Sequence, residues 1–314
     1  MASALVKSKK LGRDNILIQI WKNKGVYLVL LPGVLWYILF AYLPLYGLTL
    51  AFKTFKASLG IFHSPWVGLL NYVYVLRDQA FTESIFRTIK INSLRLLFTF
   101  PIPIILAIAI NELRVGRFKK VLQTIFTFPQ FLSWVIVASI LTNILNQNGM
   151  VNAIIRMAGG ETVNFLGSVP NFLPLIYISE IWKSSGWSAI IYLAAIAGID
   201  AEQYEAAEID GASRLQRIWH ISLPGIKGTI IVMFVLAMGY LMSAGFDQLF
   251  NISNAATFKA AETLDMYIYR VTFRNASDFS FSSAVSLFRS IINFMFLIVA
   301  DRVTKAVGGQ GLFG

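Results

Sequence analysis

The sequence predicts an all-α integral membrane protein with six transmembrane helices, and three observations support that class. The 314 residues are 56% hydrophobic and only 14% charged, whereas soluble domains carry about 25% charged residues. The chain also contains six long apolar stretches. It has no Cys, and its two His, His63 and His220, lie far apart. A membrane-spanning helical protein is expected, and disulfides, thiolate metal sites and a His-based metal site are not.

Each apolar stretch is long enough to cross a bilayer, which takes about 20 residues. The predicted spans are 26–51, 86–111, 121–145, 171–199, 228–250 and 284–304. Prolines interrupt several of them, namely Pro32, Pro44, Pro101, Pro103, Pro129 and Pro174. A transmembrane helix tolerates proline where neighbours bond the freed carbonyls, so we expect kinked helices of the kind that line a cavity.

Positive charge sets the expected orientation. The net charge of +11 would indicate nucleic acid in a soluble protein, but here Lys and Arg sit mainly in short loops. They concentrate in 1–25, 112–120, 200–227 and the C-terminal end. The positive-inside rule therefore places both termini and the loop 200–227 in the cytoplasm.

Three segments follow from this topology. They are a basic cytoplasmic tail 1–25, a six-span membrane domain 26–304 and a cytoplasmic C-terminal tail 305–314. The apolar run from Val26 is too long for the core of a signal peptide, which favours an uncleaved first helix over a cleaved leader. Within the tail, Ile16, Leu17, Ile20 and Trp21 fit either a short interfacial helix or plain tail.

The loop 200–227 predicts two short helices around a glycine. Asp200, with Gln203 three residues on, resembles a capping box that begins a helix near Ala201. Gly211 can adopt positive φ and end that helix. A second helix is expected to include Arg214, Leu215, Ile218 and Trp219, with Pro224 closing the loop.

A small face on the first of these helices suits close contact with another protein. Ala206 and Ala207 keep one side small, and Glu205 offers charge-assisted pairing with a basic partner. For the E-A-A triplet alone, a solvated loop with accidental small residues would be the better interpretation. The longer string, E-A-A-x3-G-x9-I-x-L-P, favours a helix seated in a groove of a separate, moving domain.

The same string resembles the cytoplasmic coupling loop of the membrane subunits of ATP-binding-cassette (ABC) importers. The matching positions are Glu205, Ala206, Ala207, Asp210, Gly211, Ile221, Leu223 and Pro224. Further segments resemble carbohydrate-importing permeases, especially the branch for complex oligosaccharides or polysaccharide fragments. They are 67–72, 128–134, 182–187, 192–200 and 245–248.

The resemblance implies a permease of the type I ABC importer architecture in a bacterial plasma membrane, with a coupling-helix loop here between the fourth and fifth spans. It implies a second homologous permease, two ATPase subunits, an extracellular solute-binding protein, an oligosaccharide substrate and surrounding lipid, and no nucleic acid. The chain has no G-x4-G-K-[ST] loop, so ATP and Mg are expected on the partner ATPase. It is not expected to be an enzyme or to hold a catalytic residue, cofactor or metal.

Polar and aromatic residues within or at the ends of the spans are the candidates for the substrate path. They are Asn92, Arg95, Trp182, Lys183, Trp187, Tyr192, Tyr240, Phe246, Asp247 and Arg289. Aromatic faces suit the C–H side of a sugar, and the cations Arg95, Lys183 and Arg289 would favour an acidic one. The competing interpretations are interfacial aromatic belts, Glu180 neutralising Lys183, snorkelling of Lys183, and structural pairing of the arginines with acids on other helices.

Two other functions fit a polytopic chain. Pro-broken helices and intramembrane charges also occur in transporters driven by an ion gradient, which would need no ATPase chain. A membrane-embedded enzyme would need converging acids, bases or a metal, and the sequence shows no such constellation. We therefore expect an ATP-driven importer subunit, with the secondary transporter as the alternative.

Overall fold

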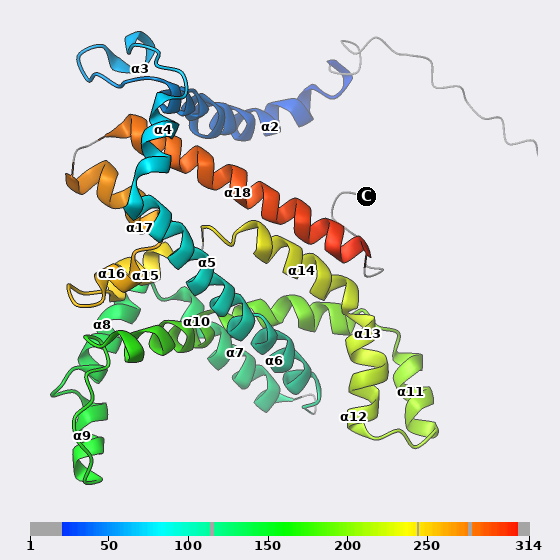
Figure 1. Cartoon of the computed structure of the whole chain (residues 1–314). Helices are drawn as coiled ribbons and strands as arrows, with labels where there is room; N and C mark the ends of the chain where they lie inside the picture. Colours follow the sequence, from blue (N-terminus) through cyan, green and yellow to red (C-terminus); the bar gives the residue numbers. More distant parts are fainter. Residues whose placement is uncertain (1–20, 114–115, 244, 276–277, 307–314) are drawn as a thin grey trace, which may run out of the picture.

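The computed structural model describes residues 21–113, 116–243, 245–275 and 278–306 (Figure 1). These residues form helices and no strand, apart from an isolated bridge between Lys53 and Trp66. Three helices are long and apolar enough to cross a membrane, and up to six spans result if each bent helix pair counts as one. The predicted helical class is confirmed, whereas most of both predicted tails lies outside the described residues.

The first predicted span, 26–51, is a helical stretch with three geometries. It comprises α2 (Lys24–Tyr37), the π-helix η1 (Ile38–Tyr42) and the 3-10 helix η2 (Leu43–Phe52). Pro44 has no N–H and cannot make the usual bond to the fourth residue before it. The π turn directly upstream accommodates that missing bond, and the helix continues through the proline.

Two short helices, α3 (Gly60–His63) and α4 (Leu70–Arg77), connect the first span to the second. The buried Asn71 side chain donates to the carbonyls of Ala51 and Lys53 and so holds α4 against the end of η2. The second span comprises α5 (Gln79–Thr99) and α6 (Pro101–Asn111) and extends earlier than the predicted 86–111.

The third predicted span, 121–145, is wrong as a single helix. The chain forms α7 (Arg117–Thr127) and η3 (Phe128–Phe131), bends by 100°, and continues as α8 (Trp134–Leu145) and α9 (Met150–Met157). Leu132 and Ser133 are extended, and the Ser133 hydroxyl accepts from Ile136 N–H to begin α8. The N-cap serine so soon after Pro129 favours two elements over one.

The fourth predicted span, 171–199, corresponds to α10 (Val169–Ala197), a single continuous helix although it contains Pro174. It packs against α6 and α7. The contact with α7 is close at Gly186, where an added Cβ would lie 2.0 Å from the carbonyl oxygen of Phe126. Gly186 therefore allows two backbones to approach in a way that a side chain would prevent.

The fifth predicted span, 228–250, is wrong beyond Gly239. Helix α14 (Lys227–Gly239) ends there, and Gly245 has a φ of +90°. Short helices then follow on the way to the last span. They are α15 (Phe246–Ile252), α16 (Phe258–Ala261), α17 (Leu264–Tyr269) and the π-helix η5 (Arg270–Asn275).

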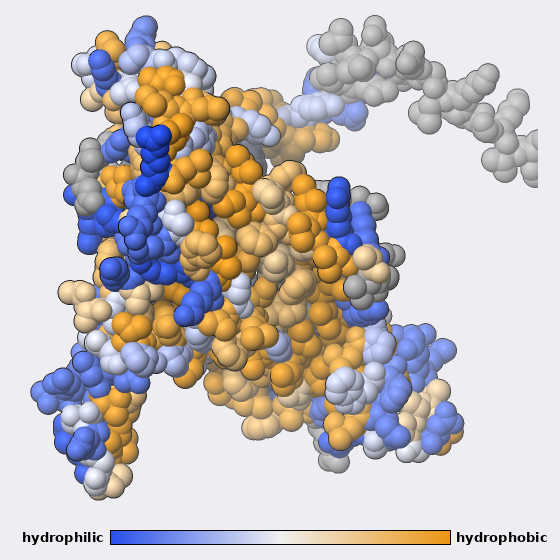
Figure 2. Space-filling model, in the orientation of Figure 1, coloured by the Kyte–Doolittle hydropathy of each residue, from blue (hydrophilic) through white to orange (hydrophobic). Residues whose placement is uncertain are grey.

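The last span is α18 (Phe279–Ala306), which packs against η2, α4 and α14 and includes the predicted 284–304. Figure 2 shows a broad apolar surface over α14 and α18, with hydrophilic residues gathered at the two ends of the molecule. A surface of this kind fits a protein surrounded by hydrocarbon. The polar ends are where the loops connecting the spans lie, including the loop 200–227 (Figure 1).

Candidate functional site: a coupling loop and an intramembrane polar seam

The loop 200–227 forms two helical arms around a glycine, as predicted. The first arm is α11 (Ala201–Ile209); the second comprises α12 (Arg214–Arg217), η4 (Ile218–Ser222) and α13 (Leu223–Gly225). Gly211 has a φ of +75°, its N–H bonds to Glu208 O at 3.1 Å, and Ala212 N–H bonds to Ala207 O at 2.8 Å. This Schellman pattern satisfies the last carbonyls of α11 and explains the glycine.

The starts of the two arms partly correct the prediction. The Asp200 carboxylate accepts from Glu202 N–H at 3.0 Å, which confirms the cap, but the expected box with Gln203 is absent. The capping box instead joins Ser213 to Gln216 at the second arm. Pro224 does not close the loop, because the π turn η4 again lies just upstream and the helix passes through the proline.

The loop is fixed to the membrane helices at its base. Tyr204 on α11 and Ser222 on η4 share a hydrogen bond of 2.9 Å. A Cβ on Gly225 would lie 2.5 Å from Ile199 Cδ1, so the returning chain passes close to the end of α10. Ile226 is fully buried in a cluster with Tyr192 of α10. The two arms therefore form one unit attached to the C-terminal end of α10.

The far side of the loop is open. Glu205, Ala206, Asp210 and Gly211 are exposed, and Ile209 is 86% exposed. The other motif residues lie toward the base: Ala207, Ile221 and Leu223 are half-buried, and Pro224 is exposed. A small, partly apolar surface with an acidic residue is thus available for contact with another protein.

Inside the membrane domain, three helices meet at a buried hydrogen-bonded seam. Arg95 of α5 donates to Gln248 of α15 at 2.5 Å. The Gln248 amide donates to the Ile176 carbonyl and the Ser179 hydroxyl of α10, at 2.7 and 2.9 Å. The guanidinium lies against Gly245, where an added Cβ would be 2.0 Å from Arg95 Nη1. The left-handed glycine therefore makes room for the buried cation.

The same seam bonds the backbone freed where the fifth span breaks. Asn92 donates to Leu241 O at 2.7 Å. Asn293 of α18 accepts from Met242 N–H at 2.9 Å and donates to the Ser243 hydroxyl at 2.7 Å. Non-helical backbone at membrane depth persists only where protein groups or water bond it. These amides supply that bonding.

Three buried polar atoms around the seam lack a partner among the described residues: Asn92 Oδ1, Arg95 Nε and Tyr177 Oη. Glu180 of α10 and Tyr177 both lie close enough to Arg95 to interact with its charge. Unpaired donors and an acceptor of this kind can bond a water molecule or a hydroxylated ligand.

The remaining predicted cations are held by other groups. Lys183 donates to Gln130 O at 2.9 Å and lies 5.5 Å from the centre of the Trp134 ring, so it fixes α10 to η3. The competing interpretation, in which Glu180 neutralises Lys183, is not supported, since no ion pair joins these two residues. Arg289 pairs with Asp265 of α17, the structural interpretation left open above.

The predicted aromatic residues do not gather at one place. Trp182, Trp187 and Tyr240 are exposed, as expected for lipid- or partner-facing rings, and Tyr192 is buried in the cluster near the loop. Phe246 stacks on Phe250 at 5.4 Å, and Asp247 is exposed. Sequence reasoning missed Gln248, Ser179 and the role of Gly245, although an amide three residues after a glycine in an apolar stretch was a usable signal.

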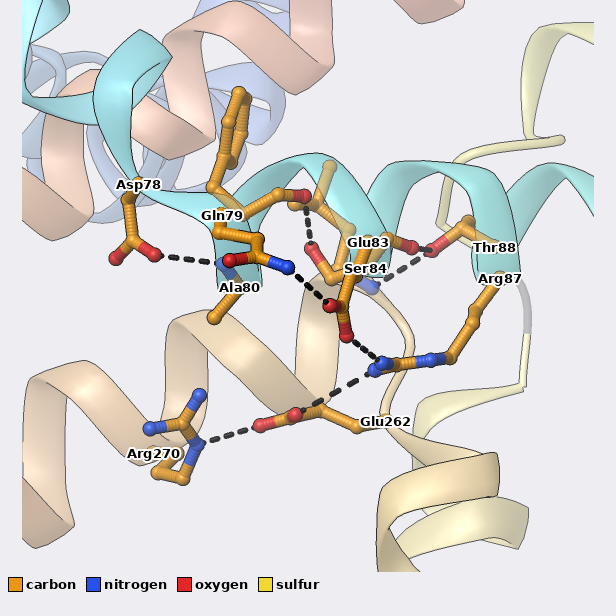
Figure 3. A network of polar contacts seen from close by, with 11 residues as sticks. Asp78, Gln79, Ala80, Glu83, Ser84, Arg87, Thr88, Glu262 and Arg270 are labelled. Atoms are coloured by element: carbon orange, nitrogen blue, oxygen red, sulfur yellow. Dashed lines mark hydrogen bonds and ion pairs between the residues drawn. The ribbon is translucent and has the colours of Figure 1, made fainter.

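A second polar network lies at the opposite end of α5 from the loop (Figure 3). Arg87 pairs with Glu83 on its own helix and lies 3.7 Å from Glu262, which Arg270 contacts at 2.5 Å. Nearby, Thr88 accepts from Leu264 N–H, and Tyr267 donates to Asp78 at 2.7 Å. The network holds α17 against α5. Within the described residues, no group of three His, Cys, Asp or Glu could hold a metal ion.

Comparison with known proteins assigns the chain to a family. Residues 100–308 match the family described as binding-protein-dependent transport system inner membrane component. The chain is 39% identical to the polygalacturonan/rhamnogalacturonan transport system permease protein YteP of Bacillus subtilis, covering 97% of this chain and 95% of that protein. It is 38% identical to LplB of the same organism, covering 93% and 92%.

A solved structure agrees. The chain superposes with a TM-score of 0.85 on a chain of a bacterial ABC transporter that imports the acidic polysaccharide alginate, at 32% identity and covering 94% and 99% of the two chains. The protein therefore belongs to the inner membrane components of binding-protein-dependent transport systems. Such subunits are not themselves enzymes.

Proposed function

We propose that this chain forms half of the translocation path of an ATP-driven importer for an oligosaccharide or polysaccharide fragment. Its partners would be a second, homologous permease, two ATPase subunits and an extracellular solute-binding protein. The similarity to YteP, which is named for polygalacturonan and rhamnogalacturonan transport, over nearly the whole chain supports the substrate class. A solved alginate importer in complex with a pentasaccharide-bound periplasmic protein, whose membrane chain matches this one at a TM-score of 0.86, supports the partners.

The observation that carries the coupling role is the exposed outer side of α11 and Gly211, opposite a base fixed to α10. A loop that transmits movement needs an exposed surface for the subunit that moves it and a fixed attachment to the helices that it moves. We propose that Glu205, Ala206, Asp210 and Gly211 contact the ATPase, and that the half-buried Ile221 and Leu223 with Pro224 transmit the movement to α14.

We further propose that six spans cross the bacterial plasma membrane, with both termini and the loop 200–227 in the cytoplasm. The seam around Arg95 would lie near mid-membrane, where the unpaired Arg95 Nε could donate to a hydroxyl or carboxylate of the passing sugar and Asn92 Oδ1 could accept from a hydroxyl. Trp182, Trp187, Tyr240, Phe246 and Asp247 would line the remainder of the path.

The test is reconstitution of the purified complex, containing all its chains, in proteoliposomes with galacturonate oligosaccharides and neutral gluco-oligosaccharides as substrates. Uptake should require ATP and the ATPase chains and persist with an uncoupler. Uptake that continued without the ATPase and stopped with the uncoupler would instead indicate the secondary transporter.

A loop variant makes the test specific. Glu205→Arg should lower sugar uptake per ATP hydrolysed while the amount of membrane-inserted chain stays normal, because it reverses the charge on the proposed contact surface. Glu161→Arg is the matched control: it is exposed on the connection between α9 and α10 and should change nothing. Equal uptake in both variants would exclude the coupling role.

A further inference from the structure

A cavity separates the coupling loop from the inner ends of two membrane helices. Its volume is about 350 Å³. One wall is formed where α6 and α10 end, at Glu112 and Ala197, and the other by Tyr204, Arg214 and Arg217 of the loop. Figure 1 shows α12 beside the ends of α6 and α10. None of these residues belongs to the motif that identified the loop.

The two walls carry opposite charge. The ends of α6 and α10 contribute the partial negative charge of their last carbonyls, and Glu112 adds a full negative charge. The loop contributes Arg214 and Arg217. Within the described residues, Arg217 is paired only with Glu208 at 3.4 Å, and neither Glu112 nor Arg214 has an ion-pair partner.

The charge distribution distinguishes two uses of the cavity. An anionic group, such as a phospholipid headgroup, would be attracted by the arginines but would also face Glu112 and two helix C-termini. Direct attraction between the walls has no such opposing contribution, and it strengthens as water leaves the cavity. The charges therefore favour closure of the cavity over occupation by an anion.

The connections on both sides of the cavity are bent. The chain turns by 73° between α10 and α11, and by 59° between the helical stretch 214–225 and α14. Between these bends, the Tyr204–Ser222 hydrogen bond joins the two arms. The loop can therefore rotate as a unit about two bends, and rotation toward the membrane would bring Arg214 to Glu112.

We propose that Glu112 and Arg214 are positioning residues that form an ion pair when ATPase-driven movement closes this cavity. The pair would stabilise one end state of the loop and tie it to α6, in addition to its attachment to α10. This inference rests on the proposed coupling function and adds a second helix to the path of the movement.

Charge reversal in the reconstituted complex tests the pair. Glu112→Arg and Arg214→Glu should each lower uptake per ATP hydrolysed by about two- to fivefold, the range that exposed ion pairs support. The double variant should recover most of that loss. Lys120→Glu on α7 is the matched control, because Lys120 is exposed on the same side, lies outside the cavity and should leave the ratio unchanged.

A second measurement follows the movement itself. Since the chain has no cysteine, Ala197→Cys with Arg217→Cys introduces a unique thiol pair across the cavity. Crosslinking by a short bifunctional reagent should increase when the complex is trapped with nucleotide. Equal yields with and without nucleotide would overturn closure, as would single reversals that leave the ratio unchanged or a double variant no better than either.

Two other outcomes have separate meanings. If Glu112→Arg raised uptake in vesicles of anionic lipid but not in neutral ones, the cavity would be a headgroup site and the ion pair would be wrong. If the unsubstituted complex showed no ATP-driven uptake, the proposed function itself would fail, and crosslinking would still report whether the cavity closes.

Discussion

The membrane seam and the coupling loop use polar residues in opposite ways. In the seam, Arg95, Gln248 and Asn293 direct their groups inward and bond the broken fifth span. In the loop, Glu205 and Asp210 have no side-chain partner among the described residues and face outward. The difference shows that a polar residue in this chain is structural where its groups are bonded and a candidate for contact where they are not.

Removing the amide at the centre of the seam should have the largest effect. Gln248→Leu leaves the buried Arg95 charge without its acceptor and frees the Ile176 carbonyl. The expected loss is about 3 kcal/mol of unfolding free energy, because a buried charged group is left without its hydrogen-bond acceptor. Asn251→Leu, on the same helix α15 but bonded only at the surface to Asp247 O, should cost less than about 1 kcal/mol. Thermal unfolding in detergent measures both, and equal losses would show that the seam is not structural.

A close backbone contact in the membrane domain comes next. Gly186→Ala places a methyl group against the Phe126 carbonyl, which must shift, and about 1–3 kcal/mol of stability should be lost. Gly228→Ala in α14 has no atom within 4 Å of its new Cβ and should instead stabilise by about 0.4–1 kcal/mol. Similar melting temperatures for the two variants would contradict the close packing of α7 on α10.

The loop glycine should respond in function more than in stability. Gly211→Val forces a β-branched residue into the left-handed region, at a local cost of about 1–2 kcal/mol that the free end of the loop can absorb by moving. The complex should assemble normally but take up less sugar per ATP. Gly211→Asn, which tolerates this conformation, should retain coupling. Normal coupling in the valine variant would mean that the shape of the turn is unimportant.

The second polar network, at the N-terminal end of α5, should give the smallest effect. Glu83→Gln removes one charge from a pair whose acid is 40% exposed, so the loss should be about 0.2–1 kcal/mol and should vanish at high salt. Glu161→Gln, exposed and without an ion-pair partner within the described residues, should be neutral at every salt concentration. A salt-independent loss at Glu83 would indicate that its aliphatic packing, and not its charge, is what counts.

Much of the fold follows from local sequence. Apolar length alone placed the first, second and last spans and the continuous helix α10, and the turn at Gly211 followed from its place after an Ala-rich helix. The breaks in the third and fifth spans depend on tertiary bonding. Residues 241–243 can leave the helix because Asn92 and Asn293 come from distant segments to bond them. Periodicity within one segment cannot show that.

In the candidate site, too, one part could be predicted from local sequence and the other depends on tertiary contacts. The loop motif lies in one segment of the sequence, so all its residues could be named from the sequence alone. The intramembrane candidates were chosen by residue type, which does not tell Arg289, whose charge is paired with the carboxylate of Asp265, from Arg95, which donates to the neutral amide of Gln248. Only the partners, which come from other helices, separate those two cases.

Two of the four Leu-Pro steps in the chain, those at 43–44 and 223–224, each directly follow a π-helical segment of five residues. A π-helical turn holds one more residue than an ordinary helical turn would, and each residue of a helix rotates the chain by about 100°. Removing one residue from 218–222 would therefore re-aim all of α14 relative to α11. The extra residue of the π-helix therefore sets the rotation of α14 about its axis relative to α11, the helix proposed to contact the ATPase.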